Sequence, residues 1–481
     1  MAGVAEKSVD WAEGGISRIA NIVNAPEAAV RLLCSIILGF PFALIHRYAL
    51  YGKNPNLQHI YFIVCGFTIG YWNYEWNVLH SASAVCVTYL TLKALGGTIQ
   101  AVVITFVYNM IHLMIGYYTT STLDYDIKWT MPQCVLTLRL IGLALDIYDG
   151  QKPKDKLSST QQKTALNRPP TFLETAAFVY FPGSFLVGPQ FSMKRYLDFV
   201  NCEFMKEDQK GESTQPLPPN SLNAGFRRAF LGVVYIGLYQ IGTLYISNDY
   251  VVSAEFLQQG FLQRCFLLGL WGRINLYKYI SCWLLTEGVC IVFGITYNGK
   301  DDQGHPRWDG CSNVHLLTFE NATKFNHYIE SFNTNTNHWC AEYIYKRVKF
   351  LGSKLYSQIV TLSFLAIWHG FHSGYYLCFL MEFIVIYSEK GVETQLAKNE
   401  ALQAALENPI FRLATWVLLK IYTLVFMGYS LIPFVLLSYD RYLPVYASVY
   451  YCGHIFFLSY PVLAPLINPL LRGKPSKPHQ Q

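Results

Sequence analysis

The stretch SQIVTLSFLAIWHGFHSGYYLCFLMEFIVIY (357–387) decides how this chain is interpreted, because it is long and apolar enough to cross a bilayer. Near its middle it carries His369. An ionisable side chain at membrane depth is costly and is typical of a reaction or transport site. His372 follows one helical turn later, where a continuous helix would place it on the same face. The pattern predicts a membrane span with a functional histidine near its centre.

The rest of the chain has the composition of a polytopic membrane protein. Of its 481 residues, 52% are hydrophobic and only 14% are charged, whereas average proteins have about 25% charged residues. Other apolar runs predict spans near residues 28–50, 59–79, 80–97, 99–119, 131–148, 171–190, 225–247, 256–272, 275–297, 411–438 and 441–471. We therefore expect an all-α integral membrane protein with about nine to twelve transmembrane or re-entrant helices.

The chain divides into three predicted parts. Residues 1–27 form an N-terminal segment, in which the apolar spacing of 11–24 predicts a short interfacial helix. Residues 28–471 form one transmembrane domain, and residues 472–481 form a basic tail. Excess lysine and arginine places three segments on the cytoplasmic side, namely 149–171, 346–354 and the tail.

A polar cluster lies upstream of His369, in SFNTNTNHW (331–339). Asn333, Asn335 and Asn337 alternate there with threonines. A carboxamide both donates and accepts hydrogen bonds, so it can orient a hydroxyl or stabilise an oxyanion. Asparagine-rich turns also cap helices, and the residues alone leave both interpretations open. We expect the surrounding stretch, 298–349, to be partly folded into the membrane, where protein must satisfy its backbone.

Basic residues follow this cluster at Lys346, Arg347 and Lys349. Arginine and lysine at the membrane–water boundary can hold phosphate groups, and they can equally bind anionic lipid headgroups. Arg273 and Lys278, in WGRINLYKY, are further candidates for phosphate contacts. A histidine base, an amide cluster and a basic strip together indicate transfer chemistry on a lipid with an anionic, water-soluble co-substrate.

Other functional classes lack their sequence signatures. The chain has no Gly-x-x-x-x-Gly-Lys-Ser/Thr phosphate loop and no Gly-x-Ser-x-Gly nucleophile elbow. It also has no Cys-x-x-Cys and no paired histidine-rich boxes, so we expect no metal site. A lipid transporter or scramblase with a polar path through the membrane remains the alternative, although the internal repeats common in transporters are missing.

The combination resembles the membrane-bound O-acyltransferase (MBOAT) family, in which an asparagine in a polar segment precedes Trp-His-Gly in a hydrophobic helix. Asn333 and Trp368-His369-Gly370 match these positions, with Asn335 and Asn337 as nearby alternatives to Asn333. Other blocks of the chain carry the same resemblance in the same order, namely YDIKWTMPQCVLTLRLIGLALDIYDG (125–150), FLVGPQFSM (185–193) and YKYISCWLLTEGVCI (277–291).

The resemblance implies a helical bundle around a central reaction chamber. It implies transfer of a fatty acyl group, polyunsaturated by preference, from acyl-CoA to the sn-2 hydroxyl of lysophosphatidylcholine or its ethanolamine and serine analogues. His369 would remove the hydroxyl proton, and Asn333 would orient the reactants or stabilise the oxyanion. The CoA phosphates would contact basic residues, chiefly Lys346, Arg347 and Lys349, with Arg273 and Lys278 as additional contacts.

The expected partners are acyl-CoA as co-substrate, a lysophospholipid and membrane lipids. No separate cofactor, metal or nucleic acid is expected, and the sequence allows either a monomer or a homo-oligomer. A sterol, a diacylglycerol or a protein also stays open as the acyl acceptor, because each offers a hydroxyl to the same base. The resemblance implies the endoplasmic reticulum membrane. In Lys477-Pro478-His479-Gln480-Gln481, Lys477 fits a dilysine retrieval signal, whereas His479 does not.

Overall fold

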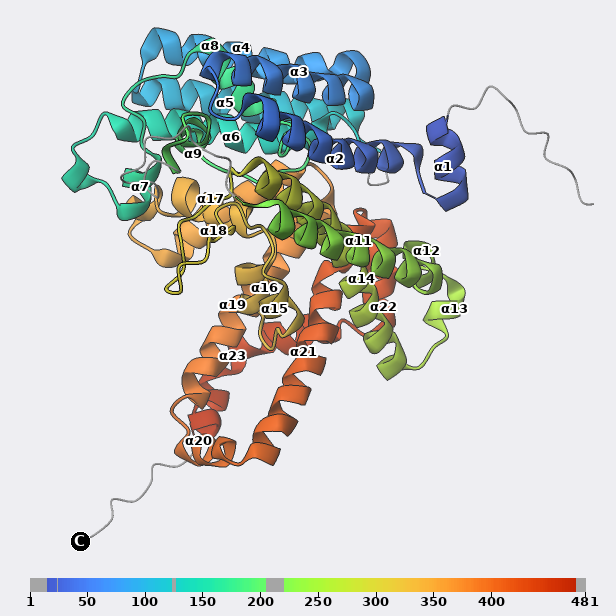
Figure 1. Cartoon of the computed structure of the whole chain (residues 1–481). Helices are drawn as coiled ribbons and strands as arrows, with labels where there is room; N and C mark the ends of the chain where they lie inside the picture. The colour runs from blue at the N-terminus through green and yellow to red at the C-terminus, as the bar shows by residue number, and fades with distance from the viewer. Residues whose placement is uncertain (1–14, 24, 123–126, 205–219, 473–481) are drawn as a thin grey trace, which may run out of the picture.

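The computed structural model describes residues 15–23, 25–122, 127–204 and 220–472. The basic tail beyond Arg472 and most of the polar loop after residue 204 lie outside these ranges. The described residues are mostly helical. The N-terminal helices gather at one end of the molecule and the last helices extend at the opposite end, with α14, α17 and α18 between them (Figure 1).

Eight helical segments of the described residues are long and apolar enough to cross a membrane. Those near the N-terminus are α2 (Glu27–Ile45), α3 with α4 (Pro55–Tyr74 and Leu79–Leu95), α5 (Ile99–Thr120) and α6 (Thr130–Gly150). Those further along the chain are α11 (Leu222–Tyr245), α14 (Phe261–Phe293), α21 (Pro409–Leu436) and α23 (Cys452–Arg472). The chain is a multi-pass membrane protein, as predicted.

The other helices are shorter or more polar. In the first half of the chain they are α1 (Gly15–Val23), α7 (Ser159–Thr164), α8 (Phe172–Val179), α9 (Met193–Val200), α12 (Asn248–Val251) and α13 (Ala254–Leu257). In the second half they are α15 (Leu316–Glu320), α16 (Phe325–Ser331), α17 (Thr334–Cys340), α18 (Lys354–His369), α19 (Ser373–Leu396), α20 (Glu400–Glu407) and α22 (Tyr439–Ser448). Helix α1 covers the described part of the predicted interfacial helix, whose residues 11–14 and 24 lie outside the described residues.

Helix α14 is the central helix, because it packs along both α11 and α21. Glycines make these approaches close. A Cβ atom on Gly225 of α11 would lie 2.5 Å from Cγ2 of Val292, and one on Gly272 of α14 would lie 2.4 Å from the Cα atom of Gly428 on α21. Small residues allow helix backbones to meet in this way inside membranes, where packing rather than the hydrophobic effect drives association. The packing fixes α14 as the platform beneath the segment that carries Asn333.

The prediction of a single span over 357–387 is wrong. Helix α18 ends at His369, and α19 begins at Ser373. Gly370 separates them with φ +120°, a backbone conformation that residues with a Cβ atom rarely adopt. His369 is therefore the last residue of a helix and not the middle of one. His372 lies beyond the break, so the expectation that both histidines share one helical face is also wrong.

Three other predicted spans differ from the structure. Residues 256–272 and 275–297 lie mostly in the single helix α14. The two residues between these runs, Arg273 and Ile274, continue the helix. Residues 171–190 contain only the eight-residue helix α8 followed by buried irregular backbone.

This irregular backbone is satisfied by Arg139 of α6. The Arg139 guanidinium donates to the carbonyl oxygens of Phe178 at 3.0 Å and Pro189 at 3.3 Å, and to the Ser184 hydroxyl at 3.0 Å. Backbone without regular structure is tolerated at membrane depth only where protein or water supplies such partners. Arg139 therefore holds this segment against α6 through carbonyl and hydroxyl oxygens.

Residues 311–349 pack into the protein, whereas the preceding residues 298–310 are mostly exposed. The three short helices α15 to α17 alternate with irregular segments in which Cys311 and Val314 are fully or almost fully buried. Val314 pairs with Phe332 as an isolated antiparallel bridge, and the backbone N–H of His315 donates to the Ser331 carbonyl at 2.9 Å. Residues 313–315 and 331–333 thus lie side by side just before α17.

Candidate active site

One ring nitrogen of His369 makes a hydrogen bond, and the other has no hydrogen-bond partner among the described residues. Its Nδ1 lies 2.7 Å from the carbonyl oxygen of Leu365, one turn earlier in α18. A carbonyl oxygen can only accept, so Nδ1 carries the proton in this contact and Nε2 of the neutral ring keeps a lone pair. The local fold therefore presents His369 with a free basic nitrogen, which is the form that a general base requires.

Aromatic rings surround His369 on several sides. Its ring centroid lies 5.5 Å from that of Tyr375, 5.1 Å from that of Phe379 and 5.5 Å from that of Phe434. Tyr375 and Phe379 come from α19, and Phe434 comes from the end of α21. This aromatic enclosure gives the half-buried His369 a largely apolar site.

Hydrogen bonds hold the end of α18 next to α5 and α6. The Trp368 indole N–H donates to the carbonyl oxygen of Cys134 at 2.9 Å, and the Tyr117 hydroxyl donates to the carbonyl oxygen of Trp368 at 3.0 Å. The ring of Tyr117 also covers Gly370, where an added Cβ atom would lie 3.4 Å from it. These contacts fix the helix end whose last residue is His369.

Asn333 precedes α17 in the left-handed backbone conformation, with φ 52° and ψ 40°. Asparagine tolerates this conformation better than other residues that carry a Cβ atom. Asn333 occupies the cap position of α17, yet its side chain makes no capping hydrogen bond. Among the described residues the Asn333 carboxamide has no hydrogen-bond partner.

The two neighbouring asparagines have structural partners instead. The Asn335 carboxamide N–H donates to the carbonyl oxygen of Cys311 at 3.1 Å. The Asn337 carboxamide N–H donates to the carbonyl oxygens of Ile329 at 2.9 Å and Phe332 at 3.0 Å. Of the three asparagines that the sequence left as alternatives, Asn333 is the one whose carboxamide is not committed to the backbone.

Two neighbouring cavities lead to this asparagine. The smaller has a volume of about 20 Å³, room for about one water molecule, and both Asn333 and Trp368 line it. The larger has a volume of about 180 Å³ and extends between α6, α7, α9 and α17. Gln190 and Asn335 line both cavities, which places the two spaces on either side of the same two side chains.

His369 lines neither of these two cavities. It lies directly after Trp368, which lines the smaller one, and aromatic rings connect its site to the Asn333 turn. The ring of Phe434 contacts His369, the ring of Tyr279 lies 6.5 Å from that of Phe434, and the ring of Phe332 lies 6.4 Å from that of Tyr279. Aromatic side chains thus lie between His369 and the Asn333 turn, and it is the neighbouring Trp368 that shares a cavity with Asn333.

The larger cavity is lined by more arginine than acidic side chains. Arg139, Arg195 and Arg347 contribute guanidinium groups, whereas Asp146 and Glu342 contribute carboxyl groups. The guanidinium groups are oriented by nearby acceptors. Arg195, for example, donates to the carbonyl oxygens of Ile295 and Tyr297 at 2.9 and 3.0 Å. The cavity wall is largely apolar, and its guanidinium groups are the donors that an anionic group could contact.

Arg347 connects this cavity to the C-terminal end of α6. One of its terminal nitrogens donates to Asp149 Oδ1 at 2.8 Å and the other contacts Oδ2, so the pair is bidentate. Asp149 is fully buried and also pairs with Lys152 at 3.0 Å. Arg347 is the one predicted phosphate ligand that lines either cavity, and its charge is partly neutralised by Asp149.

The other predicted phosphate ligands differ in their surroundings. Lys346 is exposed and pairs with Glu342, which lines the larger cavity, while Lys349 is exposed on the next turn of the chain. Arg273 lies on α14, 3.6 Å from Glu320 and over the ring of Phe319. Lys278 lies on the same helix with its Nζ 4.9 Å from the centre of the Tyr279 ring. Arg273 and Lys278 line neither cavity.

Sequence reasoning missed several residues of this region. Gln190 lies in FLVGPQFSM, which carries the family resemblance but suggested no role for its glutamine. Asn313 and Arg195 line the cavities although no motif surrounds them. The aromatic enclosure of His369 comes from α19 and α21, and only the tertiary fold brings these helices together.

Comparison with known proteins identifies the family. The profile described as MBOAT, membrane-bound O-acyltransferase family, matches residues 114–432, which include Asn333 and His369. Lysophospholipid acyltransferase 5 of Mus musculus is 42% identical over 462 residues, covering 96% of this chain and 93% of that protein. Proteins of the same name from Homo sapiens and Drosophila melanogaster are each 41% identical and cover 99% and 98% of this chain, and 96% and 94% of their own lengths. The chain is therefore a member of the membrane-bound O-acyltransferase family.

Proposed function

We propose that this protein is a lysophospholipid acyltransferase that moves a fatty acyl group from acyl-CoA to the sn-2 hydroxyl of a lysophospholipid. The single observation that carries the proposal is the placement of an uncommitted carboxamide, Asn333, and of Trp368, which precedes His369, around one small cavity. The similar proteins named lysophospholipid acyltransferase 5 support the choice of acceptor class.

The chemistry follows from the two side chains. Nε2 of His369 accepts the proton of the lysophospholipid hydroxyl as its oxygen attacks the thioester carbonyl carbon. The Asn333 carboxamide N–H donates to the oxyanion of the tetrahedral intermediate. When the intermediate collapses, the C–S bond breaks and the departing thiolate takes the proton from the His369 imidazolium. The products are an ester and free CoA, and the enzyme returns to its starting state without a covalent intermediate or a metal.

The larger cavity would hold the anionic part of acyl-CoA. It is lined by Arg347 and is flanked by Lys346 and Lys349, on the segment that the basic residues assign to the cytoplasmic side. Gln190 and Asn335 line both cavities, so the thioester would pass these two side chains to reach Asn333. Holding both substrates in one water-poor site would supply much of the acceleration through proximity. Endoplasmic reticulum residence and a polyunsaturated acyl preference belong to this proposal as expectations from the family.

The test is acyl transfer by purified protein in lipid nanodiscs. Radiolabelled acyl-CoA is supplied with lysophosphatidylcholine, its ethanolamine or serine analogue, a sterol or a diacylglycerol, and the labelled ester and released thiol are both measured. We expect equal amounts of phospholipid and CoA with lysophospholipid acceptors. Ester formed only with a sterol or a diacylglycerol would contradict the acceptor class, and no new ester at all would favour a lipid transporter.

A further inference from the structure

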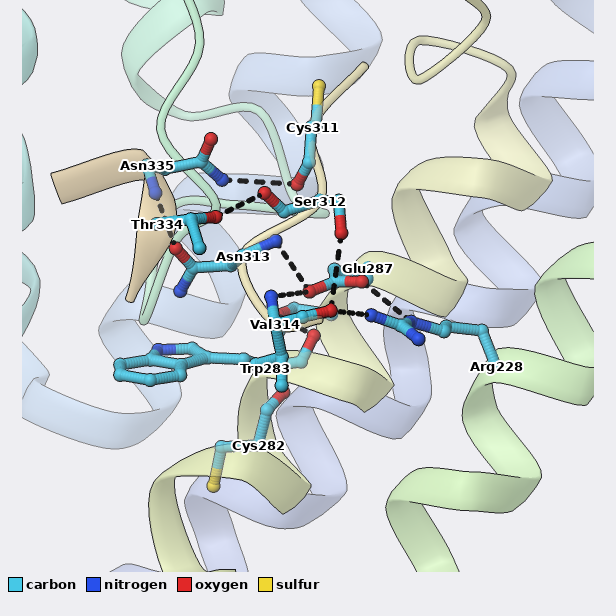
Figure 2. Close-up of polar contacts among 11 residues, drawn as sticks. Arg228, Cys282, Trp283, Glu287, Cys311, Ser312, Asn313, Val314, Thr334 and Asn335 are labelled. Atoms are coloured by element: carbon cyan, nitrogen blue, oxygen red, sulfur yellow. Dashed lines mark hydrogen bonds and ion pairs between the residues drawn. The ribbon is translucent and has the colours of Figure 1, made fainter. Parts of the chain in front are cut away.

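A buried carboxylate on α14 holds the segment next to the Asn333 turn. Glu287 is 3% exposed. Its Oε1 accepts hydrogen bonds from the backbone N–H groups of Asn313 at 2.7 Å and Val314 at 3.1 Å. Its Oε2 accepts from Arg228 Nε of α11 at 2.7 Å, and the same guanidinium donates to the carbonyl oxygen of Val314 (Figure 2). Carboxylate, guanidinium and two backbone amides thus form a closed unit.

The held segment in turn holds the two residues that follow Asn333. The carbonyl oxygen of Asn313 accepts from the Thr334 backbone N–H at 3.1 Å, and its side-chain Oδ1 accepts from the Asn335 backbone N–H at 3.0 Å. The Thr334 hydroxyl donates to the carbonyl oxygen of Ser312 at 2.9 Å (Figure 2). Each bond reaches across the same short gap between residues 311–314 and the start of α17.

The Asn333 turn is also supported on its N-terminal side, where Val314 pairs with Phe332 and the Asn337 carboxamide donates to the Phe332 carbonyl oxygen, but the bonds to residues 334 and 335 come from the Asn313 segment. A left-handed residue before a seven-residue helix is costly to maintain and persists where the surroundings determine it. Because the carboxamide itself makes no hydrogen bond in the described structure, its direction depends on the backbone that carries it. That backbone is fixed through Asn313, and Asn313 is fixed through Glu287.

We propose that Glu287 is a positioning residue for Asn333, acting through the Asn313 segment and anchored by Arg228. The inference rests on the proposed function, since the position of the Asn333 carboxamide matters for catalysis only if the carboxamide acts on a substrate. Glu287 lies outside both cavities and would not touch the substrates. Its loss would misplace the carboxamide during the chemical step and would leave the binding of acyl-CoA unchanged.

The first experiment compares Glu287→Gln with the wild-type protein, both as full-length, monodisperse protein in nanodiscs. Glutamine keeps one accepting oxygen but places an N–H₂ group against either the backbone amides or Arg228, so the unit cannot stay closed. We expect kcat per folded protein to fall about 30- to 100-fold, as small misplacements in active sites do. We expect KM for acyl-CoA to stay within about twofold, because the large cavity is untouched.

A matched control distinguishes positioning from general destabilisation. Glu174 of α8 likewise accepts from an arginine, Arg168, at 2.9 Å and from a backbone N–H, that of Thr171, at 2.6 Å. This unit caps α8 and lies outside both cavities. Glu174→Gln should lower thermal stability and leave kcat per folded protein unchanged.

A second pair of variants decides the case if Glu287→Gln does not fold. Asn313→Ala removes the acceptor for the Asn335 N–H but leaves both backbone bonds to Glu287, whereas Asn313→Asp restores an acceptor of the same shape. We expect kcat to fall in Asn313→Ala and to recover in Asn313→Asp. Wild-type kcat in Glu287→Gln or Asn313→Ala, or a raised KM with unchanged kcat, would overturn the inference. Absence of transfer by the wild-type protein would instead overturn the proposed function, and the inference with it.

Discussion

His369 and Asn333 are held in place by different kinds of structure. His369 ends a regular helix and is fixed by one backbone hydrogen bond and by packed aromatic rings. Asn333 lies in irregular backbone and is fixed at a distance, by hydrogen bonds that start at the buried carboxylate of Glu287. The comparison indicates that the apolar region supplies the base, while the polar region supplies the aimed carboxamide.

The largest expected effect is the loss of the base. His369→Ala should lower kcat by about 1,000-fold or more, because it removes the proposed general base. His369 closes α18 and its ring is half-buried, so the variant should still fold. Acyl transfer and the size-exclusion profile are measured together. Retained activity, or loss of folded protein in proportion to activity, would assign His369 a structural role.

The next largest effect is expected from the carboxamide. Asn333→Gly should lower kcat by about 100-fold, the typical cost of losing an oxyanion donor, while glycine accepts the left-handed backbone without strain. Asn333→Ala should lose similar activity and in addition about 1 kcal/mol of folding free energy, because alanine is strained in that conformation. The two variants are compared by kcat and by denaturation midpoint. An active Asn333→Gly would contradict the role of the carboxamide.

A smaller effect, on binding alone, is expected from the arginine of the large cavity. Arg347→Ala should raise KM for acyl-CoA by about tenfold with little change in kcat, as expected for one lost charged hydrogen bond. Added salt should weaken acyl-CoA binding to the wild-type protein for the same reason. Arg273→Ala is the matched control, because Arg273 lines neither cavity. Equal changes in both variants would place the anionic group elsewhere.

The smallest effect is expected from His372, the second histidine of the motif. It lies beyond the helix break, at the start of α19, where its side chain makes no capping hydrogen bond. His372→Ala should change kcat and KM by less than about threefold, within the range of a surface substitution. Steady-state kinetics beside His369→Ala provide the comparison. A loss as large as that of His369→Ala would mean that both rings serve the reaction.

Much of the fold could be predicted from the apolar runs, because a membrane demands long helices wherever backbone meets lipid. The exceptions lie where protein replaces lipid. Gly370 ends α18 inside an apolar run. Arg139 donates hydrogen bonds to irregular backbone whose sequence is apolar enough to predict a membrane span. Hydropathy records how apolar these segments are, but it cannot record which neighbour accepts or donates their hydrogen bonds.

The candidate site was predictable in its residue types and less so in its geometry. His369 and the asparagine cluster stand out because polar groups are rare among apolar runs. The distinction between Asn333 and its neighbours depends on backbone partners contributed by Cys311, Ile329 and Phe332. The link from Glu287 to Asn313 spans 26 residues and joins a helix to an irregular segment, so no local pattern could have predicted it.

The most direct test is an experimental structure with a non-hydrolysable acyl-CoA analogue and a lysophospholipid bound together. The proposed reaction requires the lysophospholipid hydroxyl within about 3.2 Å of His369 Nε2 and the analogue's carbonyl oxygen within about 3.1 Å of the Asn333 carboxamide. It also requires the CoA phosphates in the cavity lined by Arg347. A complex in which the reacting atoms lie outside the region between Asn333 and the aromatic enclosure of His369 would contradict the account.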